Sequence, residues 1–180
     1  QEKSEAFYGN YYDGNLDIDD FLNFCVQPLK DNSMDRLLEL RNKFIEVKIK
    51  PIVLTKAKEL IIDELKNNEV VIATATNSFV TRPISELFSV ENLIATEFEI
   101  KQNAFTGKVV DVPCFREGKL LKVKKWAESH HYDLRRATFF SDSLNDLPLL
   151  DEVGKAIIVD GDNRIQSVAK ENNWECISFR

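Results

Sequence analysis

One stretch decides the fold of this chain: Ala137-Thr-Phe-Phe-Ser-Asp-Ser-Leu-Asn-Asp-Leu-Pro-Leu-Leu150. Its apolar beginning is typical of a buried strand in a parallel sheet, and residues 144–153 continue with the pattern of a helix. Asp142 therefore stands at the carboxyl end of a strand, where open α/β sheets bind their ligands. Asp146 adds a second carboxylate on the same turn, and such a pair suits Mg²⁺, a cation that prefers oxygen ligands. The alternative is that these acids cap the helix by binding backbone N–H groups.

The chain from residue 51 onward alternates between expected strands and helices. Strands are expected over residues 70–74, 92–96, 138–141, 155–159 and 174–179, with a hairpin over 97–110 that turns at 103–107. Helices are expected over residues 54–67 (with Thr55 as a possible cap), 82–88 (with Pro83 in the first turn), 117–130, 144–153 and 164–172. This alternation predicts parallel βαβ units, and hence an α/β, Rossmann-like core over residues 51–180. Residues 1–50 have a helical pattern without a convincing strand, and they predict a small separate helical domain.

Composition and charge exclude some classes of protein. The chain has 180 residues, 43% of them hydrophobic, and a net charge of −6, which disfavours nucleic acid or an anionic membrane as its main partner. No apolar stretch approaches the roughly 18 residues of a membrane span, so none is expected. Cys25, Cys114 and Cys176 are odd in number and lack CxxC spacing. They predict reduced, buried thiols in a cytoplasmic protein.

Two further segments carry groups that suit a phosphate. Thr74-Ala-Thr-Asn-Ser78 follows an apolar strand, where hydroxyls and the free N–H groups around Thr74 and Ala75 can hold phosphate oxygens. Lys119 opens a helix and offers a point charge of the kind that binds phosphate. The simpler interpretations are a Ser/Thr helix cap for the first segment and solvated surface side chains for Lys119 and Arg116.

The order of these segments resembles motifs two, three and four of the haloacid dehalogenase (HAD) superfamily. The segments are Ala73–Ile84, Pro113–Lys119 and Ser141–Leu150, and they are most similar to the phosphoserine-phosphatase-like branch, subfamily IB. The resemblance covers nearly the whole chain. It implies a Rossmann-like HAD core with a parallel sheet, and it implies that residues 1–50 are part of an α-helical cap domain that closes over the site.

The resemblance also implies roles for five side chains. Thr74 would hydrogen-bond the transferring phosphoryl group, and Lys119 would offset its charge. Asp142 would bind Mg²⁺, with Asp146 supporting the metal and its waters or orienting Lys119. Asn145 would touch the phosphate or a neighbouring group.

The first motif of the superfamily, a strand that ends in Asp-x-Asp-x-Thr/Val, has no convincing match. The nearest candidate is Leu16-Asp-Ile-Asp-Asp20, but a turn over residues 11–15 precedes it and Asp20 occupies the Thr/Val position. This segment has the pattern of a helix start, with Asp19 and Asp20 solvated or capping. We therefore expect the nucleophile strand to precede Gln1. A parallel sheet without this central strand is expected to have two unpaired edges, to fold poorly and to lack activity.

The resemblance implies a Mg²⁺-dependent phosphomonoester hydrolase that acts through an aspartyl-phosphate on a small phosphorylated metabolite. Phosphoserine is one candidate, although Thr74-Ala-Thr-Asn77 stands where phosphoserine phosphatases usually have Ser-Gly-Gly. Two alternatives remain open: a phosphotransferase that uses the same intermediate, and a non-catalytic module that binds a metal or a partner.

Overall fold

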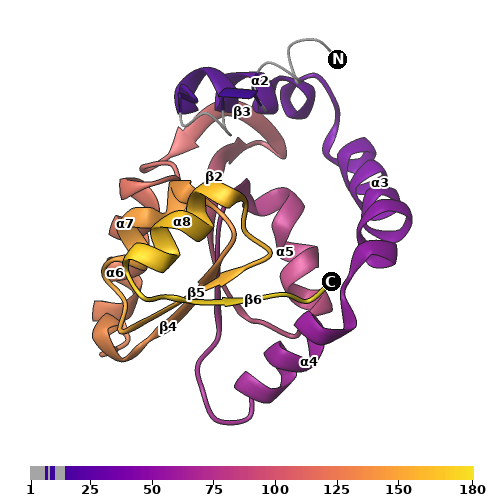
Figure 1. The fold of residues 1–180 in the computed structure, drawn as a ribbon. Helices are drawn as coiled ribbons and strands as arrows, with labels where there is room; N and C mark the ends of the chain where they lie inside the picture. The colour runs from indigo at the N-terminus through magenta and orange to yellow at the C-terminus, as the bar shows by residue number, and fades with distance from the viewer. Residues whose placement is uncertain (1–6, 8, 11–14) are drawn as a thin grey trace.

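A computed structural model describes residues 7, 9–10 and 15–180 of the chain (Figure 1). Before the first strand come α2 (Ile18–Lys30), α3 (Met34–Phe44), a π-helix η1 (Ile45–Ile49), a 3₁₀ turn η2 (Lys50–Ile52) and α4 (Thr55–Glu64). The next elements are β1 (Val71–Asn77), α5 (Ser78–Leu87), β2 (Asn92–Lys101), β3 (Ala104–Val110), α6 (Glu117–Ser129) and a 3₁₀ turn η3 (Leu134–Arg136). The chain ends with β4 (Thr138–Ser141), a 3₁₀ turn η4 (Leu144–Asp146), α7 (Leu147–Leu150), β5 (Lys155–Val159), α8 (Asn163–Glu171) and β6 (Glu175–Ile177).

The strands of the described residues form two sheets rather than one. In the first sheet β1 pairs with β2 in parallel and β2 pairs with β3 antiparallel, and in the second β4, β5 and β6 are all parallel. The expected α/β class and the parallel pairings are confirmed. β1 and β4 each have one edge that pairs with no other described strand. Within the described residues, β1 and β4 are therefore edge strands of their sheets.

A shared apolar layer joins the two sheets. Ile94 on β2, Val123 on α6 and Leu149 on α7 are buried together with Cys114. Val71 and Ala73 from β1 and Phe139 from β4 pack against this cluster. Because β1 and β4 contact the same layer, the ends of both strands are held in one part of the molecule.

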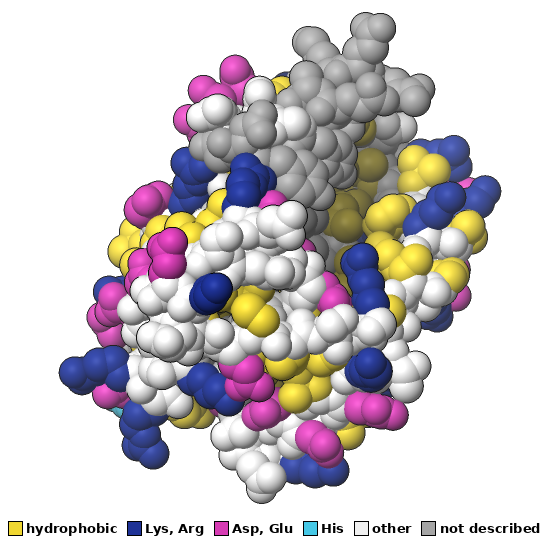
Figure 2. Space-filling view, viewed as in Figure 1, with side chains coloured by type: hydrophobic (Ala, Val, Ile, Leu, Met, Phe, Trp, Pro, Cys, Tyr) yellow, Lys and Arg dark blue, Asp and Glu magenta, His cyan; other side chains and the backbone are white. Residues whose placement is uncertain are grey.

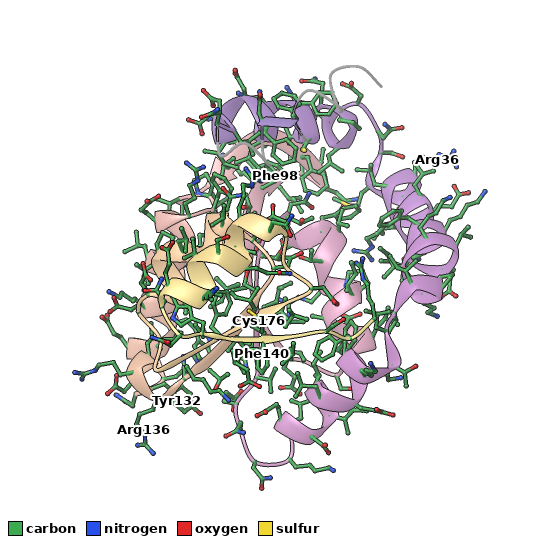
Figure 3. All side chains as sticks on the ribbon, in the orientation of Figure 1. Arg36, Phe98, Tyr132, Arg136, Phe140 and Cys176 are labelled. Carbon is green, nitrogen blue, oxygen red and sulfur yellow. The ribbon has the colours of Figure 1, made fainter. Side chains whose placement is uncertain are left out.

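The helices before β1, residues 18–64, form a helical segment that packs on the β2–β3 hairpin through α2. Leu22, Val26 and Leu29 on α2 are buried against Phe98 and Phe105 of the hairpin, and Phe98 lies beneath α2 in Figure 3. The hairpin therefore contributes to the core of the helical segment, although it lies beyond residue 50 in the sequence.

The acidic segment before α2 caps that helix. Asp17 is the N-cap, and its Oδ1 accepts hydrogen bonds from the N–H groups of Asp19 and Asp20, both at 3.0 Å. Asp19 and Asp20 are exposed, so the predicted helix start is confirmed. The turn predicted over residues 11–15 lies mostly outside the described residues.

Helix α5 begins four residues earlier than predicted. Asn77 caps it, with its Oδ1 accepting from the Val80 N–H at 3.2 Å, so Pro83 lies inside the helix and not in its first turn. Proline has no N–H to donate to the carbonyl four residues before it, which is that of Phe79. Arg41 on α3 fills this vacancy, because its Nη1 donates to the Phe79 carbonyl at 3.1 Å. The helical segment is thus tied to the first turn of α5.

Three smaller expectations are wrong. Leu54, and not Thr55, is the N-cap of α4, and no side chain bonds to that helix start. The hairpin turns at Gln102 and Asn103, whose φ angles of 49° and 59° suit a tight turn, rather than over residues 103–107. The helix expected over 144–153 is a 3₁₀ turn followed by a short α7 that ends at Leu150.

No helix in the described part of the chain is both long and apolar enough to span a bilayer. Lysine, arginine and acidic side chains are interspersed over the face shown in Figure 2.

Candidate functional site

The centre of the site is a buried ion pair between α6 and the turn after β4. Lys119 is only 6% exposed, and its Nζ donates to Asp146 Oδ1 at 2.5 Å. Ser141 Oγ donates to the other oxygen, Oδ2, at 2.7 Å. Burying two charges costs desolvation free energy, which their pairing and the added hydrogen bond offset. Lys119 is therefore not a solvated surface lysine, and its ammonium is held in one position.

Asp142 follows β4 directly and, unlike Asp146, takes no part in the buried ion pair. Its side chain is exposed, and it forms no hydrogen bond or ion pair with another residue of the described part of the chain. The two oxygens of Asp146 are both engaged, by Lys119 and Ser141, whereas those of Asp142 are available. Across residues 7, 9–10 and 15–180, no three His, Cys, Asp or Glu side chains gather as a metal site. One available carboxylate, with a second beside it, fits Mg²⁺, which keeps several waters and takes few protein ligands.

A bulge in β1 exposes the segment around Thr74. Ala73 pairs with Ile94 and Asn77 pairs with Thr96, so residues 74–76 on β1 face a single residue of β2. A bulge removes backbone groups from the regular ladder and is frequent next to active sites. Thr74 Oγ1 accepts a hydrogen bond from the Thr76 N–H at 3.2 Å, which keeps the segment curved. Thr74 and Ala75 are both half-buried on this bulge.

Cys114 links the bulge to the lysine. Its backbone N–H donates to Thr96 Oγ1 at 3.0 Å, and its thiol donates to the Ile94 carbonyl at 3.6 Å. Burial raises the pKa of the Cys114 thiol, and the nearby Lys119 ammonium and Thr74 backbone N–H oppose that shift. Thr74 and Lys119, which are far apart in the sequence, therefore flank one buried thiol.

The turn after β4 also holds Asn145, which is 6% exposed. Arg116 Nε donates to Asn145 Oδ1 at 3.1 Å, so the guanidinium belongs to the site and is not a solvated surface group. Arg116 was not predicted to be part of the site. Its only signal was its place in Cys114-Phe-Arg-Glu-Gly-Lys119, three residues before the lysine.

The three cysteines differ in burial, contrary to the expectation that all are buried. All three are free, but Cys114 is buried, Cys25 is half-buried and Cys176 is exposed on β6 (Figure 3). Burial raises the pKa of the thiols of Cys114 and Cys25, which lowers their thiolate fraction at a given pH.

We predict that a disulfide reagent at pH 8 modifies Cys176 first, Cys25 more slowly and Cys114 only on unfolding. Peptide mapping after timed quenching measures this order. Fast modification of Cys114 in the native protein would contradict the packing described here.

Comparisons with known proteins identify a family for the chain. The model of the haloacid dehalogenase-like hydrolase family matches residues 4–151. A histidinol-phosphatase from Neisseria meningitidis serogroup C (strain 8013) is 31% identical over 185 residues, which is 100% of this chain and 83% of that protein. The phosphoserine phosphatase SerB1 of Mycobacterium tuberculosis (strain ATCC 25618 / H37Rv) is 33% identical over 112 residues, which is 62% of this chain and 36% of that protein.

Solved structures have the same fold. A protein of unknown function from Bordetella pertussis Tohama I has a TM-score of 0.92 at 30% identity, over 99% of this chain and 82% of that one. A substrate-bound phosphoserine phosphatase has a TM-score of 0.70 at 20% identity, over 98% of this chain and 79% of that one. The resemblance to the phosphoserine-phosphatase-like branch, subfamily IB, is confirmed. The chain belongs to the haloacid dehalogenase-like hydrolase family.

Proposed function

We propose that the protein is a Mg²⁺-dependent phosphomonoester hydrolase that acts on a small phosphorylated metabolite. The observation that carries the proposal is the buried Lys119–Asp146 pair, which fixes a positive charge near the Thr74 bulge and the exposed Asp142. A preorganised charge in a water-poor site stabilises the charge that spreads over phosphoryl oxygens in the transition state. A phosphate-handling hydrolase has a use for this arrangement that a simple α/β binding domain does not.

Each residue has a proposed role. Lys119 offsets the negative charge of the phosphoryl group, and Asp146 holds Lys119 in place. Thr74 donates its hydroxyl, and the bulge at Thr74 and Ala75 offers N–H groups to the phosphoryl oxygens. Asn145 contacts the phosphate side of the substrate. Mg²⁺, held by Asp142 with Asp146 nearby, would neutralise charge on the phosphoryl group and the nucleophile.

The chemistry also needs a nucleophilic carboxylate. We propose that it acts from between Thr74 and Asp142, beside the unpaired edges of β1 and β4. Attack of a carboxylate oxygen on phosphorus would form an aspartyl-phosphate as the substrate alcohol leaves with a proton, and water would then release phosphate.

The helical segment is proposed to be part of a cap over the site. Its α2 packs on the β2–β3 hairpin, and Arg41 ties α3 to the first turn of α5, just after the Thr74 bulge. A cap at this position favours a substrate small enough to be enclosed. Relatives named histidinol-phosphatase and phosphoserine phosphatase support a phosphorylated amino alcohol or amino acid as the substrate.

The test is phosphate release by the full-length protein from a panel of phosphomonoesters that includes histidinol phosphate and phosphoserine. We expect turnover that requires Mg²⁺ and stops with EDTA, with one member of the panel preferred by its kcat/KM. Phosphate transfer to an added alcohol, in competition with water, would instead indicate a phosphotransferase. Metal binding without turnover of any ester would indicate a non-catalytic module and would overturn the proposal.

A further inference from the structure

Arg116 has a backbone conformation that normally belongs to glycine. Its φ is 47° and its ψ is −120°, and it directly precedes α6. Other residues with positive φ in the described chain, such as Ser89, His131 and Asn173, follow the ends of helices, where such a conformation is common. Arg116 precedes a helix instead. A strained residue of this kind persists only where its surroundings hold it, and such residues cluster at functional sites.

The side chain of Arg116 explains why a glycine does not stand there. Its Nε donates to Asn145 Oδ1 at 3.1 Å, and its guanidinium carbon lies 5.2 Å from the centre of the Phe115 ring. A guanidinium can only donate hydrogen bonds, so it fixes which end of the Asn145 amide faces it. Asn145 Nδ2 is consequently turned toward the other side, where it donates to Ser143 Oγ at 3.3 Å. A glycine at position 116 would relieve the backbone strain but could not orient the Asn145 amide.

We infer that Arg116 is a positioning residue that sets the orientation of the Asn145 amide for phosphoryl transfer. The inference rests on the proposed function, in which Asn145 contacts the phosphate side of the substrate. The hydrogen bond from Arg116 to Asn145 connects the loop before Lys119 to the turn that carries Asp142 and Asp146. Two segments with proposed roles in binding phosphate are thereby joined. The strained backbone at Arg116 is tolerated because the side chain orients Asn145.

The first experiment compares Arg116→Ala with Arg116→Gly in the full-length protein. Both remove the guanidinium, but only glycine relieves the backbone, so Arg116→Gly is expected to unfold roughly 2–4 °C above Arg116→Ala. Both variants are expected to lose kcat/KM equally, by about 10- to 100-fold, as loss of a hydrogen bond from a charged group produces. The matched control is His131→Ala and His131→Gly at the other end of α6, where φ is 61°. These should show the same order of stability with unchanged activity.

The second experiment is a double-mutant cycle with Asn145→Ala. If Arg116 acts through Asn145, then Arg116→Ala should lower kcat/KM less than about twofold further once the amide is gone. Fully multiplicative losses, or a normal kcat/KM in Arg116→Ala, would overturn the inference.

The positioning role of Arg116 can be tested separately from the proposed phosphatase activity. If the wild-type protein releases no phosphate, the same cycle is measured on the dissociation constant of inorganic phosphate by calorimetry. The same non-additive weakening supports the positioning role, and unaltered phosphate binding in Arg116→Ala overturns it.

Discussion

Asp142→Asn is expected to abolish Mg²⁺-dependent phosphate release and to leave the fold unchanged. The substitution keeps the shape of the side chain but removes the negative charge and weakens the site for Mg²⁺. Because a metal ion contributes several kcal/mol to the stabilisation of transition-state charge, kcat/KM should fall by about 10³-fold or more. The Asp142 side chain is exposed and has no partner in the described part of the chain, so the unfolding temperature should not change. Phosphate release and a thermal melt measure the two effects.

Asp151 provides the matched control for this prediction. It is also an exposed aspartate, and it is the C-cap of α7. Asp151→Asn removes the same charge from the same part of the chain and should leave both activity and Mg²⁺ affinity unchanged. A variant at Asp142 that retains activity, or equal losses at the two positions, would show that Asp142 is not a metal ligand.

The strands of the core were predictable because their patterns are local. Residues 138–141 and 155–159 form strands with the predicted bounds, since each is a short apolar run between polar turns. The start of α5 was not predictable from Pro83, because the cap at Asn77 and the bond from Arg41 allow a proline inside the helix. A contact from α3, some forty residues earlier in the chain, is not encoded in the local pattern.

The candidate site also has features that the sequence predicts and features that it does not. Thr74, Lys119, Asp142 and Asp146 could be selected because the sequence pattern places each at an expected strand end or helix start. The expected end at residue 74 is wrong, since β1 continues through the bulge to Asn77. The burial of Lys119 and the positive φ of Arg116 could not be predicted, since both depend on segments that meet only in the folded chain. Nothing in the residue type distinguishes an arginine that bonds Asn145 from one in solvent.

The buried ion pair gives Lys119 two functions that substitutions can separate. In the fold, its ammonium compensates the buried carboxylate of Asp146. In the proposed reaction, the same ammonium offsets phosphoryl charge. If only the first function existed, a neutral pair of similar size would replace the ion pair without loss, as is often observed for buried salt bridges.

Lys119→Met is therefore expected to lose both stability and activity. It leaves Asp146 buried without its cation, which should lower the free energy of unfolding by about 3–5 kcal/mol. Turnover should fall by about 10²- to 10³-fold, the usual effect of removing one preorganised electrostatic group. Lys122→Met is the control on the same helix. Lys122 Nζ donates to the Ala95 carbonyl at 3.1 Å, and it forms no ion pair with a carboxylate of the described residues.

The double variant Lys119→Met/Asp146→Asn then separates the two functions. Without a buried charge left unpaired, most of the lost stability should return, as urea titration would measure, while turnover stays at the level of Lys119→Met or below it. Recovery of both would mean that the pair serves only the fold. Recovery of stability alone would mean that the ion pair is needed for the chemistry as well as for the fold, since the repaired core would lack only the Lys119 ammonium and the Asp146 carboxylate.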